Sequence, residues 1–400
     1  MNNSFKSLPL VLSLSLLLIG CSSNKKIDAE KNTSSTLPTN GKTYTDNSSN
    51  DTGIVIGLKH SNTENKKPAN YKTLWISLKD NTVEVLTGDN FILVPYEDTF
   101  YKLENESFNI KSSNKLPTPN NKGKTSPLGS FGYKLDYYSI VSFPIDKKPA
   151  PLYSKDYVEK YIEDEGFPIQ NTIEELLYAG AQYVMINRKY YFTDGGMISA
   201  SGYSNRLYNI GKIEGSNPLD IKQFILGDLT STLEEFRSKY NIAPEPPDEN
   251  PLQSKRYFVD DKNILILRAE GKWNSYVPLT EEHINKGSGS INTKATKNLL
   301  LPQSVSTKLT IHDNLILPFE KIKERIPEAV DAVSSPNGKM LIVLTKNNLQ
   351  IFINAKDILS TPIKIIELDK PYTLVLNQWA TGKYVSSWTK QLHNYLKDNK

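Results

Sequence analysis

The chain has 400 residues, a formal net charge of +4 and one cysteine, Cys21. Basic and acidic residues are interspersed along it, so the sequence has no basic stripe of the kind that binds nucleic acid. Because no cysteine follows Cys21, the rest of the chain has neither a thiol nucleophile nor a Cys-ligated metal site.

The first segment is apolar and short. Lys6 precedes an apolar run from Leu8 to Ile19, which is shorter than the roughly 20 residues that a membrane-spanning helix needs. Such a run after a positive charge is typical of the hydrophobic region of an export signal. Polar sequence rich in Ser, Asn and Lys follows at once. We therefore predict that residues 1–20 are a signal peptide.

The end of this run, Leu18-Ile19-Gly20-Cys21, resembles the lipobox of bacterial lipoproteins. The resemblance implies that a diacylglyceryl group is attached to the thiol of Cys21 and that cleavage makes Cys21 the first mature residue. The alternative is a signal peptide cleaved elsewhere, which would leave an exported protein with an unpaired thiol. Acylation gives the thiol a role, because two or more acyl chains hold a protein firmly at about 0.8 kcal/mol per buried CH₂. The expected location is the extracytoplasmic face of the cell membrane.

The segment after Cys21 is polar as far as about Asp51 and contains mainly Ser, Asn, Thr, Lys and Asp. Such a composition cannot bury enough apolar surface to offset the entropy of ordering. We interpret residues 21–51 as the acylated cysteine with a flexible tether, and residues 52–400 as a β-rich globular region. No later apolar run is long enough to span a bilayer, so we expect the protein to be anchored to the membrane without crossing it.

The globular region is predicted to be mainly β. Its β-branched and aromatic runs are separated by Asp, Asn and Gly, which is typical of antiparallel hairpins in a meander. A turn is expected at Lys79-Asp80-Asn81. The predicted strands are Thr52–Leu58, Thr73–Leu78, Thr82–Leu86, Phe91–Pro95, Phe100–Leu103, Tyr137–Phe143, Gln182–Phe192, Arg206–Ile210, Arg256–Arg268, Lys308–Leu317 and Lys339–Ile353.

Helices are the minority. Two capping-box sequences, Asn171–Glu174 and Ser231–Glu234, predict the starts of short helices. An amphipathic helix is predicted at the C-terminus, where apolar residues recur at three- and four-residue spacing. We expect this helix to pack on its own domain, and docking of a partner or a membrane is the alternative. Its apolar stripe consists of Tyr384, Trp388, Leu392 and Tyr395 or Leu396.

Three polar segments interrupt the predicted strands: Lys111–Lys124, Ala243–Lys255 and Lys286–Lys297. They are interpreted either as domain boundaries or as surface insertions between hairpins. The proline-rich segment at 243–255 is the candidate internal boundary of the globular region.

One stretch resembles a β-propeller blade. Residues Asp331–Leu344 contain Ser335-Pro336-Asn337-Gly338-Lys339 followed by an apolar strand, and Asn348–Ile353 follows as the paired strand. Pro-Asn-Gly makes the turn, and the next strand is buried on both faces. Because a propeller needs several blades, an irregular β-propeller is kept as an alternative architecture. From about Phe319 to Tyr384 the chain is also similar to uncharacterised lipoproteins of Gram-positive bacteria, which implies location and architecture without an activity.

No catalytic motif stands out. The four histidines do not form a metal-spaced pair, and no Gly-x-Ser-x-Gly sequence is present. Ser112-Ser113-Asn114-Lys115 matches S-x-x-K, but it lies in a polar loop without the partner motifs of penicillin-binding enzymes. We interpret the histidines as surface or capping residues and expect no metal or cofactor. They are His60, His283, His312 and His393.

Carboxylates and tyrosines leave two hypotheses open. Glu163-Asp164-Glu165 is the densest acidic cluster and is interpreted as a solvated helix end, although a carboxylate pair for glycoside cleavage is compatible with the composition. The chain has 22 tyrosines, among them the pairs Tyr137-Tyr138 and Tyr190-Tyr191, and also Trp75 and Trp273. Such side chains can form a sugar-stacking patch, but tyrosine is also a favoured strand residue.

Three functions follow from these observations. The first hypothesis is a non-enzymatic lipoprotein, anchored through Cys21, that binds an envelope protein or glycan. The alternative is a glycan-acting envelope hydrolase with an unrecognised carboxylate site. A solute receptor is the weakest, because the alternating βα units of a two-lobed parallel-sheet protein are missing.

Overall fold

The computed structural model describes residues 44, 50–62, 67–112, 133–147, 171–194, 197–213, 217–241, 253–287, 290–354 and 361–398. Within these residues the protein is mainly β, as predicted, with three sheets and a few short helices. The predicted signal peptide, Cys21 and most of the 21–51 tether lie outside the described residues. So do most of the 243–255 segment and the acidic cluster Glu163–Glu165.

The first sheet has five strands in the order β18-β1-β2-β3-β19, and every neighbouring pair is antiparallel. The sheet joins the two ends of the described chain, because β18 pairs with β1. Asp80 and Asn81 connect β2 and β3 with positive φ angles of 49° and 61°, which confirms the predicted turn as the tight hairpin type. The strands are β1 (Thr52–His60), β2 (Asn70–Lys79), β3 (Thr82–Asp89), β18 (Thr373–Thr381) and β19 (Lys397–Asp398).

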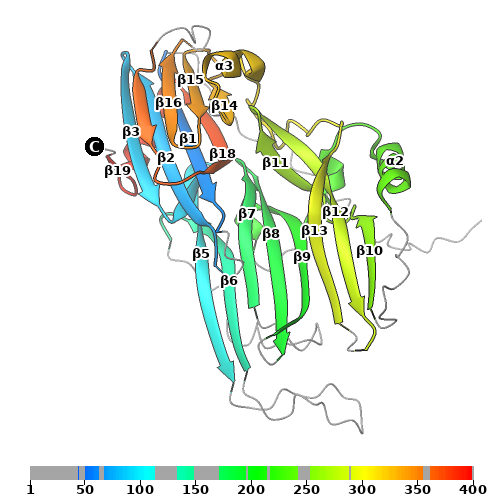
Figure 1. Ribbon diagram of the computed structural model, residues 1–400. Helices are drawn as coiled ribbons and strands as arrows, with labels where there is room; N and C mark the ends of the chain where they lie inside the picture. The colour runs from blue at the N-terminus through cyan, green and yellow to red at the C-terminus, as the bar shows by residue number, and fades with distance from the viewer. Residues whose placement is uncertain are drawn as a thin grey trace, which may run out of the picture. The chain divides into compact units, whose positions relative to one another are not determined.

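The second sheet has ten strands in the order β10-β12-β13-β9-β8-β7-β6-β5-β4, with β11 paired to β12 (Figure 1). Strands on both sides of the 243–255 segment therefore belong to one sheet. Its members are β4 (Phe91–Tyr96), β5 (Thr99–Ser112), β6 (Tyr133–Pro144), β7 (Asn171–Ala179), β8 (Tyr183–Asp194), β9 (Met197–Asn209), β10 (Gln253–Val259), β11 (Leu265–Ala269), β12 (Lys272–Asn285) and β13 (Ser290–Leu300).

A buried carboxylate lies where β6 and β7 separate. These strands pair in parallel only as far as Tyr138 and Ile173. Beyond that point the Glu174 carboxylate accepts the N–H of Ile140 at 3.0 Å, in place of a strand partner. Arg188 holds the other oxygen of Glu174 at 2.6 Å, so the buried charge is paired.

The third sheet is a four-stranded antiparallel meander of β14 (Asp331–Ser334), β15 (Met340–Leu344), β16 (Asn348–Ile353) and β17 (Lys364–Glu367). The predicted turn is confirmed, because Gly338 adopts a φ of 72°, and β15 is buried at every position. This sheet has the strand number of a propeller blade, but the other two sheets of the described residues have five and ten strands. The described part of the chain therefore lacks the repetition that a propeller requires.

The described helices are η1 (Ile210–Lys212), η2 (Ile221–Phe224), α2 (Leu229–Tyr240), α3 (Phe319–Arg325) and α4 (Lys383–Leu392). The helix predicted at Ser231 is present as α2 but begins earlier, because Asp228 caps it by accepting the N–H groups of Thr230 and Ser231. The predicted C-terminal helix is confirmed as α4, which buries Val385, Trp388 and Leu392.

Three local predictions are wrong. The sequence Asn171–Glu174 begins strand β7, because pairing with β8 and burial of Ile173 override its capping pattern. The predicted loop at Lys286–Lys297 is largely β13, a polar strand with many exposed side chains. The predicted strand at Lys308–Leu317 is irregular, since this segment brings Asp313 to the buried side chain of Arg268.

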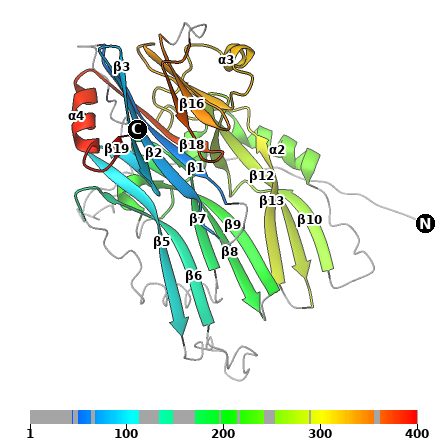
Figure 2. The same cartoon turned by 60° about the vertical axis from the view of Figure 1, so that its left-hand side comes forward.

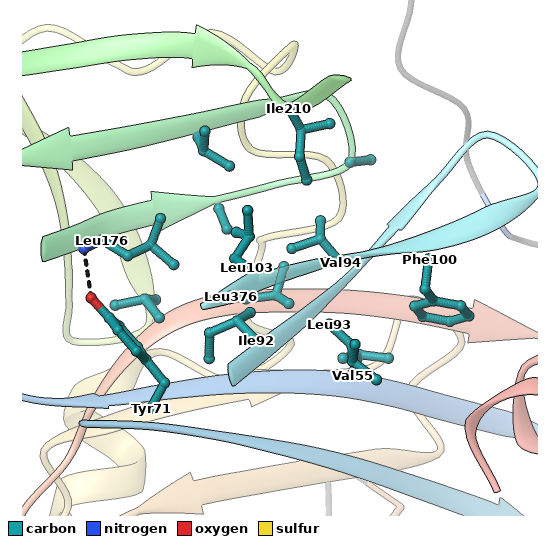
Figure 3. Close-up of a cluster of buried hydrophobic side chains, with 14 of the residues drawn as sticks. Val55, Tyr71, Ile92, Leu93, Val94, Phe100, Leu103, Leu176, Ile210 and Leu376 are labelled. Carbon is teal, nitrogen blue, oxygen red and sulfur yellow. Dashed lines mark hydrogen bonds between the residues drawn. The ribbon is translucent and has the colours of Figure 1, made fainter. Parts of the chain in front are cut away.

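The main core lies where apolar residues of the five-stranded sheet meet β4, β5, β7 and β8 (Figure 3). Val55 and Leu376 come from the first sheet, and Ile92 and Leu176 from the second. The Tyr71 hydroxyl accepts the N–H of Leu176 at 2.9 Å and so joins β2 to β7. Burial raises the pKa of Tyr71 well above its usual range, which keeps this hydroxyl neutral.

A buried ionic network joins all three sheets. Arg268 of β11 is 1% exposed and contacts two carboxylates, Asp313 and Asp331 of β14. Asp313 also accepts a hydrogen bond from the side-chain amide of Asn377 in β18 at 3.2 Å. Each carboxylate is further satisfied by backbone N–H groups, those of Trp273 and Gly271 respectively. The network therefore fixes the sheets to one another at a single buried point.

The folded region begins earlier than the predicted boundary at Thr52. Tyr44 is 4% exposed, and its ring lies edge-on to Trp388 of α4 with the centroids 4.9 Å apart. Its carbonyl accepts the N–H of Thr381 at 3.0 Å. Tyr44 therefore belongs to the packed body, although the sequence places it in the tether.

Candidate ligand-binding site

A pocket of about 700 Å³ lies between the β2–β3 hairpin and α4. Figure 2 shows α4 alongside these strands. The hairpin wall consists of residues that face each other across the ladder, Ser77 opposite Glu84 and Lys79 opposite Thr82, so all four side chains are on one face. Asp80, in the turn, completes this wall.

The helix wall follows from the periodicity of α4. The spacing of the helical residues Val385, Ser386, Thr389 and Lys390, with His393 just after α4, places their side chains on one stripe. The adjoining stripe, which begins at Val385, carries Trp388 and Leu392 into the core. Among the described residues that line the pocket, Val385 is the only one with a hydrocarbon side chain.

The pocket exists because, along one face of β2, the large side chain of Trp75 is followed by the small side chain of Ser77. Trp75 fills the space under α4, where its indole N–H donates to the Thr389 hydroxyl at 3.0 Å and its ring contacts Trp388. Ser77 is the next residue of β2 on the same face, and its small side chain leaves the space open. The pocket volume lies within the range of roughly 300–1,000 Å³ that is typical of small-ligand sites.

Glu84 connects the two walls. One of its oxygens lies 3.0 Å from Nε2 of His393, and the other accepts a hydrogen bond from Ser77 at 3.4 Å. The carboxylate thus lies between the serine and the histidine. In a Ser-His-acid triad the imidazole must contact the serine, so this order of groups does not activate Ser77 as a nucleophile. The arrangement instead holds Glu84 as a fixed hydrogen-bond acceptor.

The remaining charges of the pocket are unpaired. Within the described residues, Lys79 and Lys390 form no ion pair, and neither does Asp80. All three side chains are exposed to solvent in the pocket. They are therefore available to a ligand without the cost of breaking an existing ion pair.

The residues singled out from the sequence are scattered. Cys21 lies outside the described residues, as do Ser113–Lys115. Of the histidines, only His393 lines the pocket. His60 contacts the carbonyl oxygen of Pro371, and His283 contacts Glu281.

His312 adopts a left-handed φ of 53°, and its Nε2 is buried without a hydrogen-bond partner in the described part of the chain. Burial lowers the pKa of this imidazole. The described residues contain no group of three or more His, Cys, Asp or Glu side chains placed to hold a metal ion.

The aromatic residues are mostly structural. Trp75 and Trp273 are buried in the core, and Tyr137 is 8% exposed. Tyr190 covers Gly202 on the neighbouring strand, where an added Cβ would lie 2.1 Å from the tyrosine hydroxyl. Among the described residues that line the pocket, there is no Phe, Tyr or Trp.

Two further charge clusters lie outside the pocket. Burial lowers the pKa of Lys59, which is 7% exposed and lies near Glu175. On β12, partial burial raises the pKa of Glu281, but hydrogen bonds from Tyr257, His283 and Lys255 outweigh it and bring the pKa to about 2. Neither cluster contributes a residue to the lining of the pocket between β2–β3 and α4.

Sequence reasoning missed the pocket residues Ser77, Lys79, Glu84 and Lys390. The helical stripe from Ser386 to His393 could have been found from its spacing alone. The hairpin face could have been found in the same way from the alternation of β2 and β3. The two stripes are some 300 residues apart in the sequence, and the sequence alone does not show that they lie opposite each other in the fold.

No protein-family model, no curated protein and no solved structure matches this chain. Its function has to be inferred from its own residues. None of the helices in the described part of the chain is long and apolar enough to cross a lipid bilayer.

Proposed function

We propose that this protein is a lipid-anchored extracytoplasmic lipoprotein that binds an envelope glycan in the pocket between β2–β3 and α4. The observation that carries the proposal is the polar lining of that pocket, with hydroxyl, ammonium, carboxylate and imidazole groups around one hydrocarbon side chain, Val385. A hydroxyl-rich ligand can satisfy such donors and acceptors. A protein partner generally docks on aromatic or aliphatic contact sites, and Val385 is the single such side chain among the described residues that line this pocket.

The membrane anchor is supported by the sequence. Cys21 ends a lipobox-like motif and is the only cysteine in the chain. Metabolic labelling with an alkyne-tagged fatty acid is expected to label the protein and to lose the label in Cys21→Ser, which should also leave the membrane fraction. Ser22→Ala is the matched control and should stay labelled. Labelling of Cys21→Ser would contradict the anchor.

The binding function is tested by filling the pocket. Ser386→Trp places a large side chain on the pocket-lining stripe of α4, whereas Ser387→Trp places it on an exposed neighbouring position that does not line the pocket. Retention of envelope glycan fractions on the immobilised protein is expected to be lost in Ser386→Trp and kept in Ser387→Trp. Equal retention by both variants, or no retention by the unmodified protein, would contradict the proposal.

Glycan hydrolysis is the second candidate, because Asp80 and Glu84 both line the pocket. A pair of carboxylates flanking one bond is the arrangement that glycosidases use. Hydrolysis predicts that retained glycan is shortened over time and that Glu84→Gln stops the shortening without loss of binding. Retention of intact glycan over the same period would exclude this candidate.

A further inference from the structure

The lysine and carboxylate side chains that line the pocket are not paired with each other. Four charged side chains besides His393 line it, yet neither lysine is within ion-pair distance of either carboxylate. Glu84 is occupied by His393 and Ser77. Two ammonium groups and one free carboxylate, Asp80, thus remain for a ligand.

The two ammonium groups come from different walls. Lys79 is the last residue of β2, and Lys390 lies in the last turn of α4. A basic residue in that turn stabilises the helix by itself, so Lys390 alone would carry no functional meaning. The position of Lys79 has no such explanation, since it extends from the hairpin into the same pocket.

We propose that this pocket selects glycans that carry carboxylate or phosphate groups. Lys79 and Lys390 pair with the anionic groups of the ligand, while Asp80 accepts hydrogen bonds from its hydroxyls. A neutral glycan satisfies only Asp80 and leaves the ammonium groups without counter-charges. This inference rests on the proposed glycan-binding function and adds the chemical class of the ligand.

The inference is tested by calorimetric titration with three probes of similar length: an oligogalacturonate, a poly(glycerol phosphate) oligomer and a neutral maltooligosaccharide. Lys79→Gln and Lys390→Gln are each expected to weaken binding of the acidic probe about two- to fivefold, as exposed ion pairs do, and the double variant about tenfold. Raising the salt concentration should have the same effect in the unmodified protein. Binding of the neutral probe should not change.

The control variant is Lys346→Gln, which removes an exposed lysine from the turn between β15 and β16, outside the pocket. It should bind like the unmodified protein. The carboxylate and phosphate probes distinguish the two sources of anionic charge, because preference for either one supports the inference and names the group.

The possible failures are distinct. Equal affinity for the acidic and neutral probes, with both lost in Ser386→Trp, would overturn the charge selectivity and leave the proposed function intact. Binding of the acidic probe that persists in Ser386→Trp would place the anionic site elsewhere and overturn the inference. Absence of binding by every probe would overturn the proposed function and this inference with it.

Discussion

Replacing Arg268 by Met tests how the three sheets are held together. The guanidinium is 1% exposed, and Asp313 and Asp331 beside it are 8% and 7% exposed. Arg268 donates to Asp331 at 2.9 Å, to Asp313 and to the carbonyl of Ala332 at 2.7 Å. Arg268→Met keeps an apolar side chain of similar length but leaves two buried carboxylates without a counter-charge.

The expected cost is large. Breaking a buried ion pair by removing one partner typically lowers the free energy of unfolding by about 3–5 kcal/mol. Total stabilities are only about 5–15 kcal/mol, so the variant should lose about a fifth or more of its stability. Backbone N–H groups still satisfy part of each carboxylate, which keeps the loss within this range.

The matched control is Lys321→Gln. Lys321 pairs with Glu324 at 2.9 Å within α3, where the two side chains are 62% and 60% exposed. An exposed pair contributes about 0.2–1 kcal/mol. Urea unfolding followed by tryptophan fluorescence should therefore show a midpoint shift several times larger for Arg268→Met. Equal shifts would refute the reasoning, because they would mean that burial of the network has no energetic consequence.

The loss of stability in Arg268→Met, measured as the free energy of unfolding, should also depend on pH. Burial already raises the pKa of Asp313, and the Arg268 guanidinium opposes that rise. Without Arg268 the folded-state pKa rises further above the unfolded value of 3.8. The folded state then binds more protons than the unfolded state in this window, so the deficit should shrink as the pH falls toward 4. A deficit that grows with acidity would contradict this account.

Three more predictions concern other parts of the fold. Lys59→Met should raise the free energy of unfolding by about 1–2 kcal/mol at neutral pH, because it removes a buried ammonium group that forms no ion pair within the described part of the chain. Burial lowers the pKa of Lys59 below 10.5, so the unfolded chain keeps the proton up to a higher pH than the folded chain. The stability gain of Lys59→Met should therefore fade as the pH rises toward 10.5, which unfolding measured over a pH series can show. A gain that is independent of pH would contradict this prediction. Glu281→Gln should be less stable than the unmodified protein above about pH 4.5, because the pKa of Glu281 is lowered from 4.5 to about 2 in the folded state. The two stabilities should become equal as the pH falls through about 2. A difference that persists at about pH 2 in acid unfolding would count against this prediction. Gly53→Ala should cost about 1–3 kcal/mol and shift the tryptophan emission, because an added Cβ would lie 2.1 Å from the buried ring of Trp75; unchanged emission and stability would show that the ring can move freely.

Local chemistry made much of the fold predictable. The hairpin turn at Asp80-Asn81 and the turn at Pro336-Asn337-Gly338 need backbone conformations that these residues favour, and both are present. The stripe of α4 was readable because three- and four-residue spacing has one structural meaning over that length.

The errors occur where distant contacts decide the structure. Asn171–Glu174 has the pattern of a helix start, but the buried Glu174 is explained only by Arg188 and by the N–H of Ile140. Likewise, the alternation at 308–317 resembles a strand, while the segment is shaped by the contact of Asp313 with Arg268. Tyr44 is isolated in polar sequence, and its burial depends on α4, which lies at the other end of the chain.

Tyr44 and the pocket share α4, which links the proposed anchor to the proposed binding site. Trp388 packs on Tyr44, while Thr389, the next residue, lines the pocket. Tyr44 is 23 positions after Cys21, the proposed anchor. In the purified protein, Tyr44→Ala should weaken glycan binding because it removes the support of α4, whereas deletion of residues 30–39 should leave the affinity unchanged. If the deletion weakened binding as much as Tyr44→Ala, the coupling would run through the deleted residues and not through the packing of Tyr44 on α4.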